Sequence, residues 1–272
     1  MNIAEGQLTL DAAGTAQPFA DAMFAEAAAP APSSAAGEKP VSLTAAEADG
    51  MSDPNPDPAT EAAAERLYGR RIVYRFLKRA FDIVFSAAAL VCLSWLYLIV
   101  AIAIKLDDPA GPVFFVQERV GRNGKRFRMW KFRSMCSDAE AKLAALQAQN
   151  EKDGPVFKMA EDPRVTRVGR FIRKTSIDEL PQFANVLLGH MSVVGPRPAL
   201  PREVAAYTPR QRQRLLVKPG ITCYWQTRRN RDSISFDEWV ALDLLYIKKC
   251  SIWTDFKLII QTIGVVLTAQ GS

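Results

Sequence analysis

Two adjacent carboxylates, Asp178 and Glu179, are the side chains in this sequence best suited to chemistry. They lie in the run Thr-Ser-Ile-Asp-Glu-Leu-Pro-Gln, residues 175–182, at the expected start of a helix. Ser176 and Glu179 also fit a capping box, which would explain both acids as part of a helix cap. With Ser176 as the cap, Pro181 would remove a helical hydrogen bond, whereas a helix that starts at Asp178 places the proline in its first turn. A helix cap and a reactive pair therefore both remain open.

The reactive interpretation is phosphate chemistry. The start of a helix presents free N–H groups that can hold a phosphate. Each ionised carboxylate would repel that phosphate by about 4 kcal/mol at 4 Å and an effective dielectric of 20. Nearby arginines and a divalent cation on Asp178 and Glu179 would offset the repulsion, and Mg²⁺ commonly joins carboxylates to substrate phosphates. A carboxylate in such a setting can also attack phosphorus as a covalent nucleophile.

Three groups of arginines are candidates for binding such a phosphate. The first group recurs every three residues and would form one cationic ridge on a helix: Arg164, Arg167, Arg170 and Arg173. Arg197 stands between two prolines, which stiffen the backbone and pre-position its guanidinium, although a surface turn has the same composition. The third group lies near Trp225, and a solvated loop is the alternative there: Arg228, Arg229 and Arg231.

The charge of the chain is unevenly distributed. The whole sequence carries +6, but residues 1–65 contain eleven acids and one lysine, which leaves +16 beyond them. So basic a body favours an anionic partner such as nucleic acid, a phosphorylated substrate or an acidic membrane. The four cysteines form no CxxC pair and the single histidine is His190, so the sequence supports neither a zinc site nor a disulfide framework nor a His-based triad.

The composition divides the chain at about residue 65. Residues 1–65 are predicted to be a disordered acidic leader, with a short helix near 62–67, because they offer few large apolar side chains. Residues 66–272 are predicted to form one membrane-associated domain. Residues 83–104 carry no charge and are long enough for about one bilayer crossing, which predicts a membrane helix over about 81–105; a buried core helix is the alternative. Both flanks are basic, so a hairpin that enters and leaves on one face fits the positive-inside rule better than a simple crossing.

The remaining elements mix strand and helix. Residues 113–119 and 125–132 are predicted strands around an Asn-Gly turn, and the second strand alternates basic and apolar residues. Two amphipathic helices follow in the C-terminal third. Three tryptophans could lie at a lipid headgroup boundary, with an ordinary helical core as an equal alternative: Trp225, Trp239 and Trp253.

In their order along the chain, these motifs resemble the bacterial sugar transferase family, the monotopic phosphoglycosyl transferases that begin glycan assembly on polyprenyl phosphate. The resemblance covers about residues 75–270. The matching segments are Lys78-Arg79-Ala80-Phe81-Asp82, Gly111-Pro112-Val113-Phe114-Phe115, Gln117-Glu118-Arg119-Val120-Gly121, Lys131-Phe132-Arg133-Ser134-Met135, residues 175–182, Met191-Ser192-Val193-Val194-Gly195-Pro196-Arg197-Pro198, and Lys218-Pro219-Gly220-Ile221-Thr222.

The resemblance implies an α+β fold that is mostly helical, with a re-entrant membrane helix, a small β-hairpin and amphipathic interfacial helices. It also implies transfer of a sugar-1-phosphate from a UDP-sugar to polyprenyl (undecaprenyl) phosphate through a covalent aspartyl-phosphosugar intermediate. UMP is released, and the reaction is the first step of exopolysaccharide, capsule or glycan assembly. The expected place is the inner (cytoplasmic) membrane, with the catalytic domain on the cytoplasmic face. The expected partners are UDP-sugar, polyprenyl phosphate, membrane lipid and a second copy of the chain, without nucleic acid.

The resemblance also assigns residues. Asp178 is the expected nucleophile, and Glu179 is its partner in a Mg²⁺ site or a base. Five further residues fall where the family places groups that support substrate, phosphate or metal: Lys131, Arg173, Arg197, Arg231 and Asp243.

Two positions depart from the family's usual pattern. The family breaks its membrane helix with a Ser-Pro pair where this chain has Ser94-Trp95, and it has an aspartate where this chain has His190. Without the proline, a straight crossing stays open. These departures are also the basis of an alternative function, a catalytically inactive basic membrane adaptor that binds acidic lipid or an assembly partner.

Overall fold

A helix over Pro58–Gly69 lies across the predicted boundary between leader and domain. The computed structural model describes residues 43, 47–48, 50–151, 153–157, 159, 161–228 and 233–267. The chain divides into two units, residues 1–38 and 39–272, and all described residues belong to the second. Most of the predicted leader therefore lies outside the described residues. The short helix predicted near 62–67 lies within α3 (Pro58–Gly69), which extends across the boundary predicted at 65.

Helix α3 has a well-defined start and a buried face. Asp57 accepts a hydrogen bond from the Ala59 N–H at 3.0 Å, and Pro58 occupies a position where its missing N–H is not needed. Thr60, Ala64 and Leu67 are buried, and the helix packs against α11 (Phe236–Lys249). Residues 58–65 thus contribute to the folded body.

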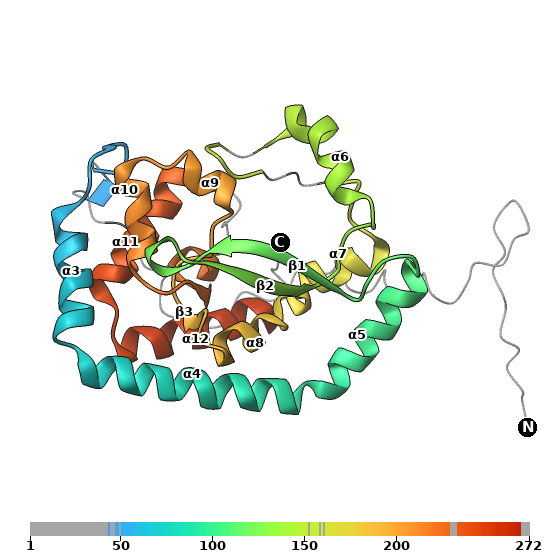
Figure 1. Cartoon of the computed structure of the whole chain (residues 1–272), viewed down its shortest axis with the longest axis horizontal. Helices are drawn as coiled ribbons and strands as arrows, with labels where there is room; N and C mark the ends of the chain where they lie inside the picture. The colour runs from blue at the N-terminus through green and yellow to red at the C-terminus, as the bar shows by residue number, and fades with distance from the viewer. Residues whose placement is uncertain are drawn as a thin grey trace, which may run out of the picture. The chain divides into compact units, whose positions relative to one another are not determined.

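The apolar segment forms two helices, α4 (Ile72–Cys92) and α5 (Ser94–Asp107), bent by 58° around Leu93. Within the described part of the chain no single helix is long and apolar enough to cross a membrane. The two helices of this bent pair, taken together, have the length and composition for one crossing. Figure 1 shows α4 running beneath the core and α5 turning away from its line toward the hairpin. The predicted single helix over 81–105 is therefore two helices.

The bend occurs without a proline because the two helices pack on different partners. Helix α4 lies on α8 (Gln182–Leu187), and α5 lies on α7 (Arg167–Lys174). Asp107, at the end of α5, accepts a hydrogen bond from the Val168 N–H at 2.9 Å. Tertiary contacts at both ends supply the angle that a proline supplies in other bent helices.

The predicted β-hairpin is confirmed. Strands β1 (Phe114–Val120) and β2 (Arg126–Phe132) are antiparallel, and the tight turn Arg122–Gly124 (η2) between them holds Asn123 at φ 56°. Asparagine tolerates this left-handed conformation better than most residues. Phe127 and Met129 of β2 are buried, whereas Arg126 and Arg128 are exposed, as the alternating pattern predicts.

The other elements surround the hairpin and complete the core. A two-stranded parallel sheet pairs β3 (Ser192–Val194) with β4 (Gly220–Thr222). The remaining helices are α6 (Ala139–Leu146), α9 (Pro201–Ala205), α10 (Pro209–Arg212) and α12 (Ile252–Leu267). Short 3-10 turns cover Gln147–Gln149 (η3), Ile177–Glu179 (η4), Gln213–Leu216 (η5) and Tyr224–Thr227 (η6).

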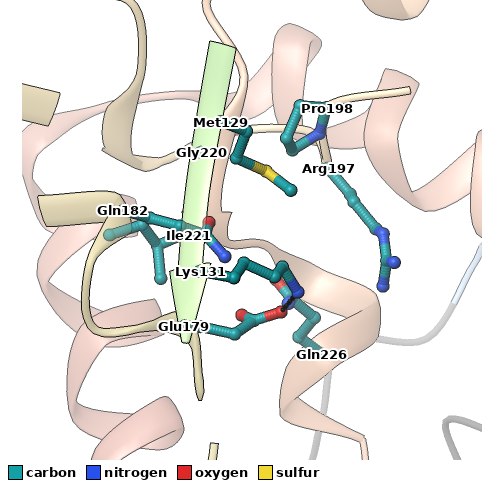
Figure 2. Close-up of a pocket in the computed structure, with 9 residues that line it drawn as sticks. All are labelled: Met129, Lys131, Glu179, Gln182, Arg197, Pro198, Gly220, Ile221 and Gln226. Atoms are coloured by element: carbon teal, nitrogen blue, oxygen red, sulfur yellow. Dashed lines mark hydrogen bonds and ion pairs between the residues drawn. The ribbon is translucent and has the colours of Figure 1, made fainter. Parts of the chain in front are cut away.

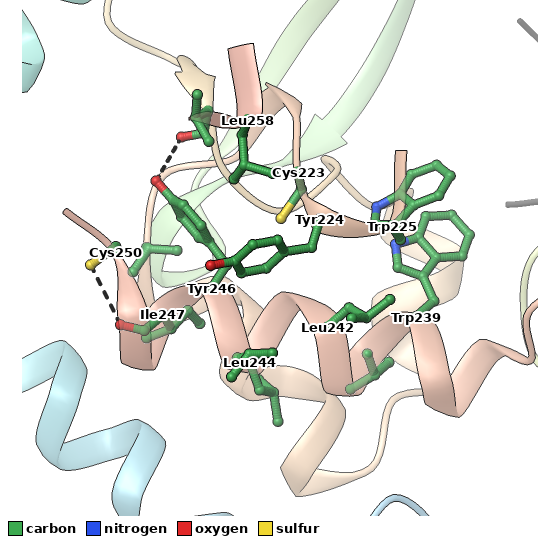
Figure 3. Close-up of a cluster of buried hydrophobic side chains, with 14 of the residues drawn as sticks. Cys223, Tyr224, Trp225, Trp239, Leu242, Leu244, Tyr246, Ile247, Cys250 and Leu258 are labelled. Atoms are coloured by element: carbon green, nitrogen blue, oxygen red, sulfur yellow. Dashed lines mark hydrogen bonds between the residues drawn. The ribbon is translucent and has the colours of Figure 1, made fainter. Parts of the chain in front are cut away.

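The main core is built around α11, whose inward residues Leu242, Leu244 and Tyr246 are almost fully buried (Figure 3). Trp225 and Trp239 belong to this core, with ring centroids 4.2 Å apart, so the core alternative is correct for both. Trp253 differs, because it is 78% exposed on α12 and stacks on Phe256.

Candidate functional site

Asp178 and Glu179 lie in the 3-10 turn η4 instead of a capped helix. Ser176, just before the turn, adopts a left-handed conformation (φ 57°) and makes no side-chain capping bond. Helix α8 begins at Gln182, after Pro181. The capping-box interpretation is therefore wrong, because an N-cap residue normally has extended backbone and Ser176 is left-handed. A non-glycine residue held in this strained region is a frequent feature of functional sites.

Lys131 of β2 holds the two carboxylates together. Its ammonium nitrogen Nζ lies 2.7 Å from Glu179 Oε1 and 3.7 Å from Asp178 Oδ2. All three side chains are at least three-quarters buried. The structure thus brings three of the predicted site residues into one cluster, which we call the Lys131 triad. Figure 2 shows the lysine reaching Glu179 from the strand.

Burial makes Asp178 an unusual carboxylate. Its pKa is raised to about 6. Loss of solvent is the largest cause and the charge of Glu179 acts in the same direction, while the charges of Lys131, Arg173 and Arg197 act in the opposite direction. At neutral pH the group is still mostly ionised. A carboxylate that is ionised but poorly solvated is a stronger nucleophile than an exposed one.

A narrow pocket lies directly beside the triad. Its volume is about 10 Å³, close to the space of one water molecule. Lys131 and Glu179 line one side, and Arg197 lies across from them (Figure 2). Asp178, which pairs with the same lysine, does not line the pocket. The other lining residues are Met129, Gln182, Pro198, Gly220, Ile221 and Gln226. A nucleotide sugar does not fit this volume, so binding one requires the pocket to widen.

Backbone contacts hold Arg197 in place. Gly220 donates a hydrogen bond from its N–H to the Pro196 carbonyl at 2.9 Å, and Gly195 donates one to the Thr222 carbonyl at 2.9 Å. A Cβ at Gly220 would overlap the amide of Gly195, so this approach requires glycine. The rigid arginine predicted from the two prolines therefore also depends on β4.

Arg119 supports the same loop and was not predicted as a site residue. Its guanidinium donates to the Pro198 carbonyl at 2.9 Å and to the Gln117 side chain at 2.6 Å. Burial, together with the charge of the nearby Arg197, lowers the pKa of Arg119 to about 10. The signal in the sequence was the Gln-Glu-Arg segment that resembles the family.

Asn185 is a second residue that sequence reasoning missed. It is 1% exposed, its side-chain amide donates to the Arg128 carbonyl at 2.7 Å, and its side-chain oxygen accepts from the Trp130 N–H at 3.0 Å. These two bonds join α8 to the middle of β2, next to Lys131. An isolated asparagine in a helix gives no sequence signal for such a clamp.

We expect Asn185→Leu to destabilise the protein by about 2–4 kcal/mol, because two buried backbone groups of β2 would lose their partners. Thermal unfolding of the purified protein measures this effect. Asn55→Ala, at an exposed position, is the control, and equal stability of the two variants would contradict the clamp.

The other three predicted site residues lie outside the Lys131 triad or outside the described residues. Arg173, half-buried at the end of α7, acts on the Asp178 pKa by its charge. Asp243 does not line the pocket, because it is fully buried on α11 and forms an ion pair with Arg214 at 2.7 Å. Arg231 lies outside the described residues.

The structure also corrects the predicted arginine ridge and shows where His190 lies. The predicted ridge of four arginines contains three, because Arg164 precedes α7 and is buried in an ion pair with Asp162. His190 is exposed beside the Phe127 ring and does not line the pocket.

The carboxylates of the triad fit one metal ion of a particular kind. Mg²⁺ is usually held by one or two carboxylates and completes its shell with water and substrate phosphates. Asp178 and Glu179 supply that number of oxygen ligands, and they already share one cation, the Lys131 ammonium. In the described part of the chain, no group of three or more His, Cys, Asp or Glu side chains is placed to hold a metal. The two carboxylates thus fit a Mg²⁺ ion that takes most of its other ligands from a phosphate and from water.

Comparison with known proteins gives consistent matches. The family model described as "Bacterial sugar transferase" matches residues 73–269. Galactosyl transferase CpsE of Streptococcus agalactiae serotype III is 47% identical over 205 residues, 75% of this chain and 44% of that protein. UDP-glucose:undecaprenyl-phosphate glucose-1-phosphate transferase of Escherichia coli is 42% identical over 202 residues, 70% of this chain and 40% of that protein. Exopolysaccharide production protein ExoY of Sinorhizobium fredii is 37% identical over 199 residues, 72% of this chain and 87% of that protein. The chain spans less than half the length of the first two relatives and most of the third.

Proposed function

Because this chain belongs to the bacterial sugar transferase family, we propose that it transfers a sugar-1-phosphate from a UDP-sugar to polyprenyl phosphate and releases UMP. The observation that carries the proposal is the buried Asp178 with Glu179 under the single ammonium of Lys131. Relatives whose names specify both sugar and acceptor use galactose, glucose or N-acetylgalactosamine, with undecaprenyl phosphate as the acceptor. By this reasoning the chain is a phosphotransferase that starts assembly of an exopolysaccharide or a related glycan.

The proposed reaction has two displacements at one phosphorus atom. In the first, a carboxylate oxygen of Asp178 attacks the β-phosphorus of the UDP-sugar. The bond from that phosphorus to the oxygen bridging the two phosphates breaks, and UMP leaves with the electron pair. In the second, a phosphate oxygen of the polyprenyl phosphate attacks the same phosphorus and frees Asp178. Each step exchanges one P–O bond for another, so no oxidant or reductant is needed.

The neighbouring charges have separate tasks in this scheme. Arg197, across the pocket, binds a phosphate of the nucleotide sugar, and Lys131 keeps Asp178 ionised and oriented. Glu179 and Asp178 would hold Mg²⁺, and the bound ion would supply positive charge against the diphosphate. Arg173 adds positive potential behind the nucleophile.

An extensive exposed apolar surface supports placement in a membrane. Patches of this kind on a protein surface mark membrane or protein contacts. Five side chains of α5 are more than half exposed: Trp95, Leu98, Ile99, Ile102 and Leu106. Three of α12 are at least half exposed: Trp253, Phe256 and Ile260. In this proposal α4 and α5 enter and leave the same leaflet as a re-entrant pair, α12 lies at the interface, and the pocket faces the cytoplasm.

Adding UDP-sugar and undecaprenyl phosphate to detergent-solubilised protein is expected to release UMP. A panel of UDP-sugars identifies the sugar, because no residue described above distinguishes glucose, galactose and their N-acetylated forms. EDTA should abolish the release and excess Mg²⁺ should restore it, since the triad carboxylates would otherwise repel the diphosphate. Lipid binding without UMP release across the whole panel would contradict the proposal and favour the adaptor function.

Single cysteines placed at Arg75 and Lys125 are expected to be protected from an impermeant thiol reagent in intact cells. Arg75 lies in the first turn of α4 and Lys125 follows the hairpin turn beyond α5, so a re-entrant pair leaves both on the cytoplasmic side. The exposed native Cys92 and the half-buried Cys136 are replaced by serine beforehand, and Cys223 and Cys250 are buried. Labelling after cell lysis serves as the control for reactivity. Labelling of one site in intact cells would mean that the segment crosses the membrane.

A further inference from the structure

A second, larger cavity lies at the start of α4. Its volume is about 500 Å³, and its walls come from α3, α4, the hairpin turn, β3, α11 and the segment before β4. It shares no lining residue with the pocket beside the Lys131 triad. The reaction proposed above assigns it no role.

The polar side of this cavity is strongly cationic. Five basic residues line it, and we call four of them the α4 cation cluster: Arg75, Arg79, Arg122 and Lys218. Across the described residues, none of the four forms an ion pair with a carboxylate. A fifth cation of the lining, Lys78, is neutralised by Asp255 at 2.9 Å. The lining carboxylate, Asp82, accepts hydrogen bonds from Ser192 and Val193.

The cations of the cluster are close together. A Cβ built on Gly189 would lie 3.3 Å from Arg79 Nη2 and 3.8 Å from Lys218 Nζ, so these two nitrogens are no more than about 7 Å apart. The guanidinium carbons of Arg122 and Arg75 lie 4.1 and 5.2 Å from the centre of the Tyr68 ring. Partial burial and the charge of Arg79 lower the pKa of Lys218. Like charges gathered in a partly buried space repel one another unless an anion enters between them.

The other side of the cavity is apolar and continues onto the outer face of α4. Leu67 and Val217 are buried in the wall, whereas Ile72 and Phe76 line the cavity and are also well exposed. The exposed Val73 and Leu77 extend the same apolar face of α4. A ligand in this cavity therefore meets cations at one end and an apolar surface at the other. A free inorganic anion satisfies the first part alone.

We propose that this cavity binds the phosphate headgroup of an anionic membrane phospholipid, with the acyl chains along the apolar face of α4. The ligand is the phospholipid because its two parts match the two sides of the cavity and because α4 begins the segment placed in the membrane above. The choice of a phospholipid, and not a free phosphate, as the ligand rests on the proposed membrane placement. The site would anchor α4, and through Arg79 it would also touch α8, since Arg79 donates to the carbonyls of Val186 and Leu187 at 2.7 and 2.8 Å.

The test is thermal unfolding of the full chain in a neutral detergent with four added probes: short-chain phosphatidylglycerol, short-chain phosphatidylcholine, inorganic phosphate and undecaprenyl phosphate. We expect phosphatidylglycerol to raise the Tm of the wild type by several degrees, and phosphatidylcholine and inorganic phosphate to have little effect. The double variant Arg122→Gln/Lys218→Gln should lose most of this rise. Without added lipid it should be at least as stable as the wild type, because two mutually repelling charges are gone. Tm does not depend on turnover, so this test can fail or succeed independently of UMP release.

A matched control removes two exposed cations that do not line the cavity, Lys125→Gln and Arg202→Gln, and should keep the full rise. If the double variant does not fold, Lys218→Gln alone replaces it, because the Lys218 ammonium makes no hydrogen bond or ion pair within the described structure. Equal shifts in the cavity and control variants would overturn the proposal. An equal shift with inorganic phosphate would assign the site to a free anion, and a shift with undecaprenyl phosphate but not with phosphatidylglycerol would assign it to the lipid substrate. Either of these outcomes also overturns it.

Discussion

Asp178→Asn is expected to abolish UMP release and at the same time to make the protein more stable. An amide oxygen is a poor nucleophile toward phosphorus, so the loss should exceed about 10³-fold. The gain in stability has a separate cause. Burial raises the pKa of Asp178 to about 6, about two units above the ordinary value, which corresponds to about 3 kcal/mol spent on holding the ionised form. A neutral isostere should recover about 1–3 kcal/mol of this, since Lys131 keeps Glu179 as a partner.

The sign of this effect with pH follows from the direction of the shift. Because the folded protein holds the Asp178 proton more tightly than the unfolded chain does, its stability falls as the pH rises from about 4 to about 6 and then stays level. The advantage of Asp178→Asn should therefore be full at pH 8 and vanish below about pH 4. Tm values of the two proteins at several pH values measure it. Asp53→Asn, at an exposed position, should change neither Tm nor turnover. Turnover by Asp178→Asn at the wild-type rate would exclude Asp178 as the nucleophile.

Lys131→Met is expected to lower kcat/KM for the UDP-sugar by about 10²- to 10³-fold. The lysine is the cation nearest to both carboxylates of the triad, at 2.7 and 3.7 Å. Without it, Asp178 and Glu179 repel each other and also repel the incoming diphosphate. The pKa of Asp178 should rise further, because its largest opposing charge is lost.

The pH profile distinguishes this role from a merely structural one. The acidic limb of kcat/KM should move to higher pH in Lys131→Met, and Lys131→Arg, which keeps the charge, should move it back toward the wild type. Lys125→Met is the matched control, since that lysine lies exposed at the turn of the same hairpin. An unchanged profile together with lower activity would indicate that Lys131 positions the strand and does not tune the nucleophile.

Local signals in the sequence were sufficient for several elements. The Asn-Gly turn and the alternation in residues 125–132 predicted the hairpin, because turn geometry and strand period are local properties. The proximity of Lys131 to Asp178 and Glu179 followed from the resemblance to the family. Composition alone could not have given it, since the lysine is 47 residues away from Asp178 along the chain.

Other features depend on contacts that sequence patterns do not encode. The capping box at Ser176 matched its pattern but failed, because the chain turns through a left-handed residue before Pro181. Trp225 and Trp239 suited a membrane boundary as well as a core, and only the packing of α11 decides for the core. Arg119 and Asn185 act through the backbone carbonyls and amides of distant segments, which no spacing rule predicts.

The bend at Leu93 has a consequence for biosynthesis. Leu93 donates to the Ala89 carbonyl and accepts from the Tyr97 N–H, so the backbone is nearly helical through the break and little in residues 72–107 alone opposes straightening. The groups that hold the angle, in α7 and α8, are translated about sixty or more residues later. A peptide of residues 72–107 should therefore cross a bilayer as one straight helix. The nascent chain would pass through the same straight form unless insertion of α4 and α5 waits for the residues that follow. The rate of translation of those residues could therefore decide the final orientation of α4 and α5.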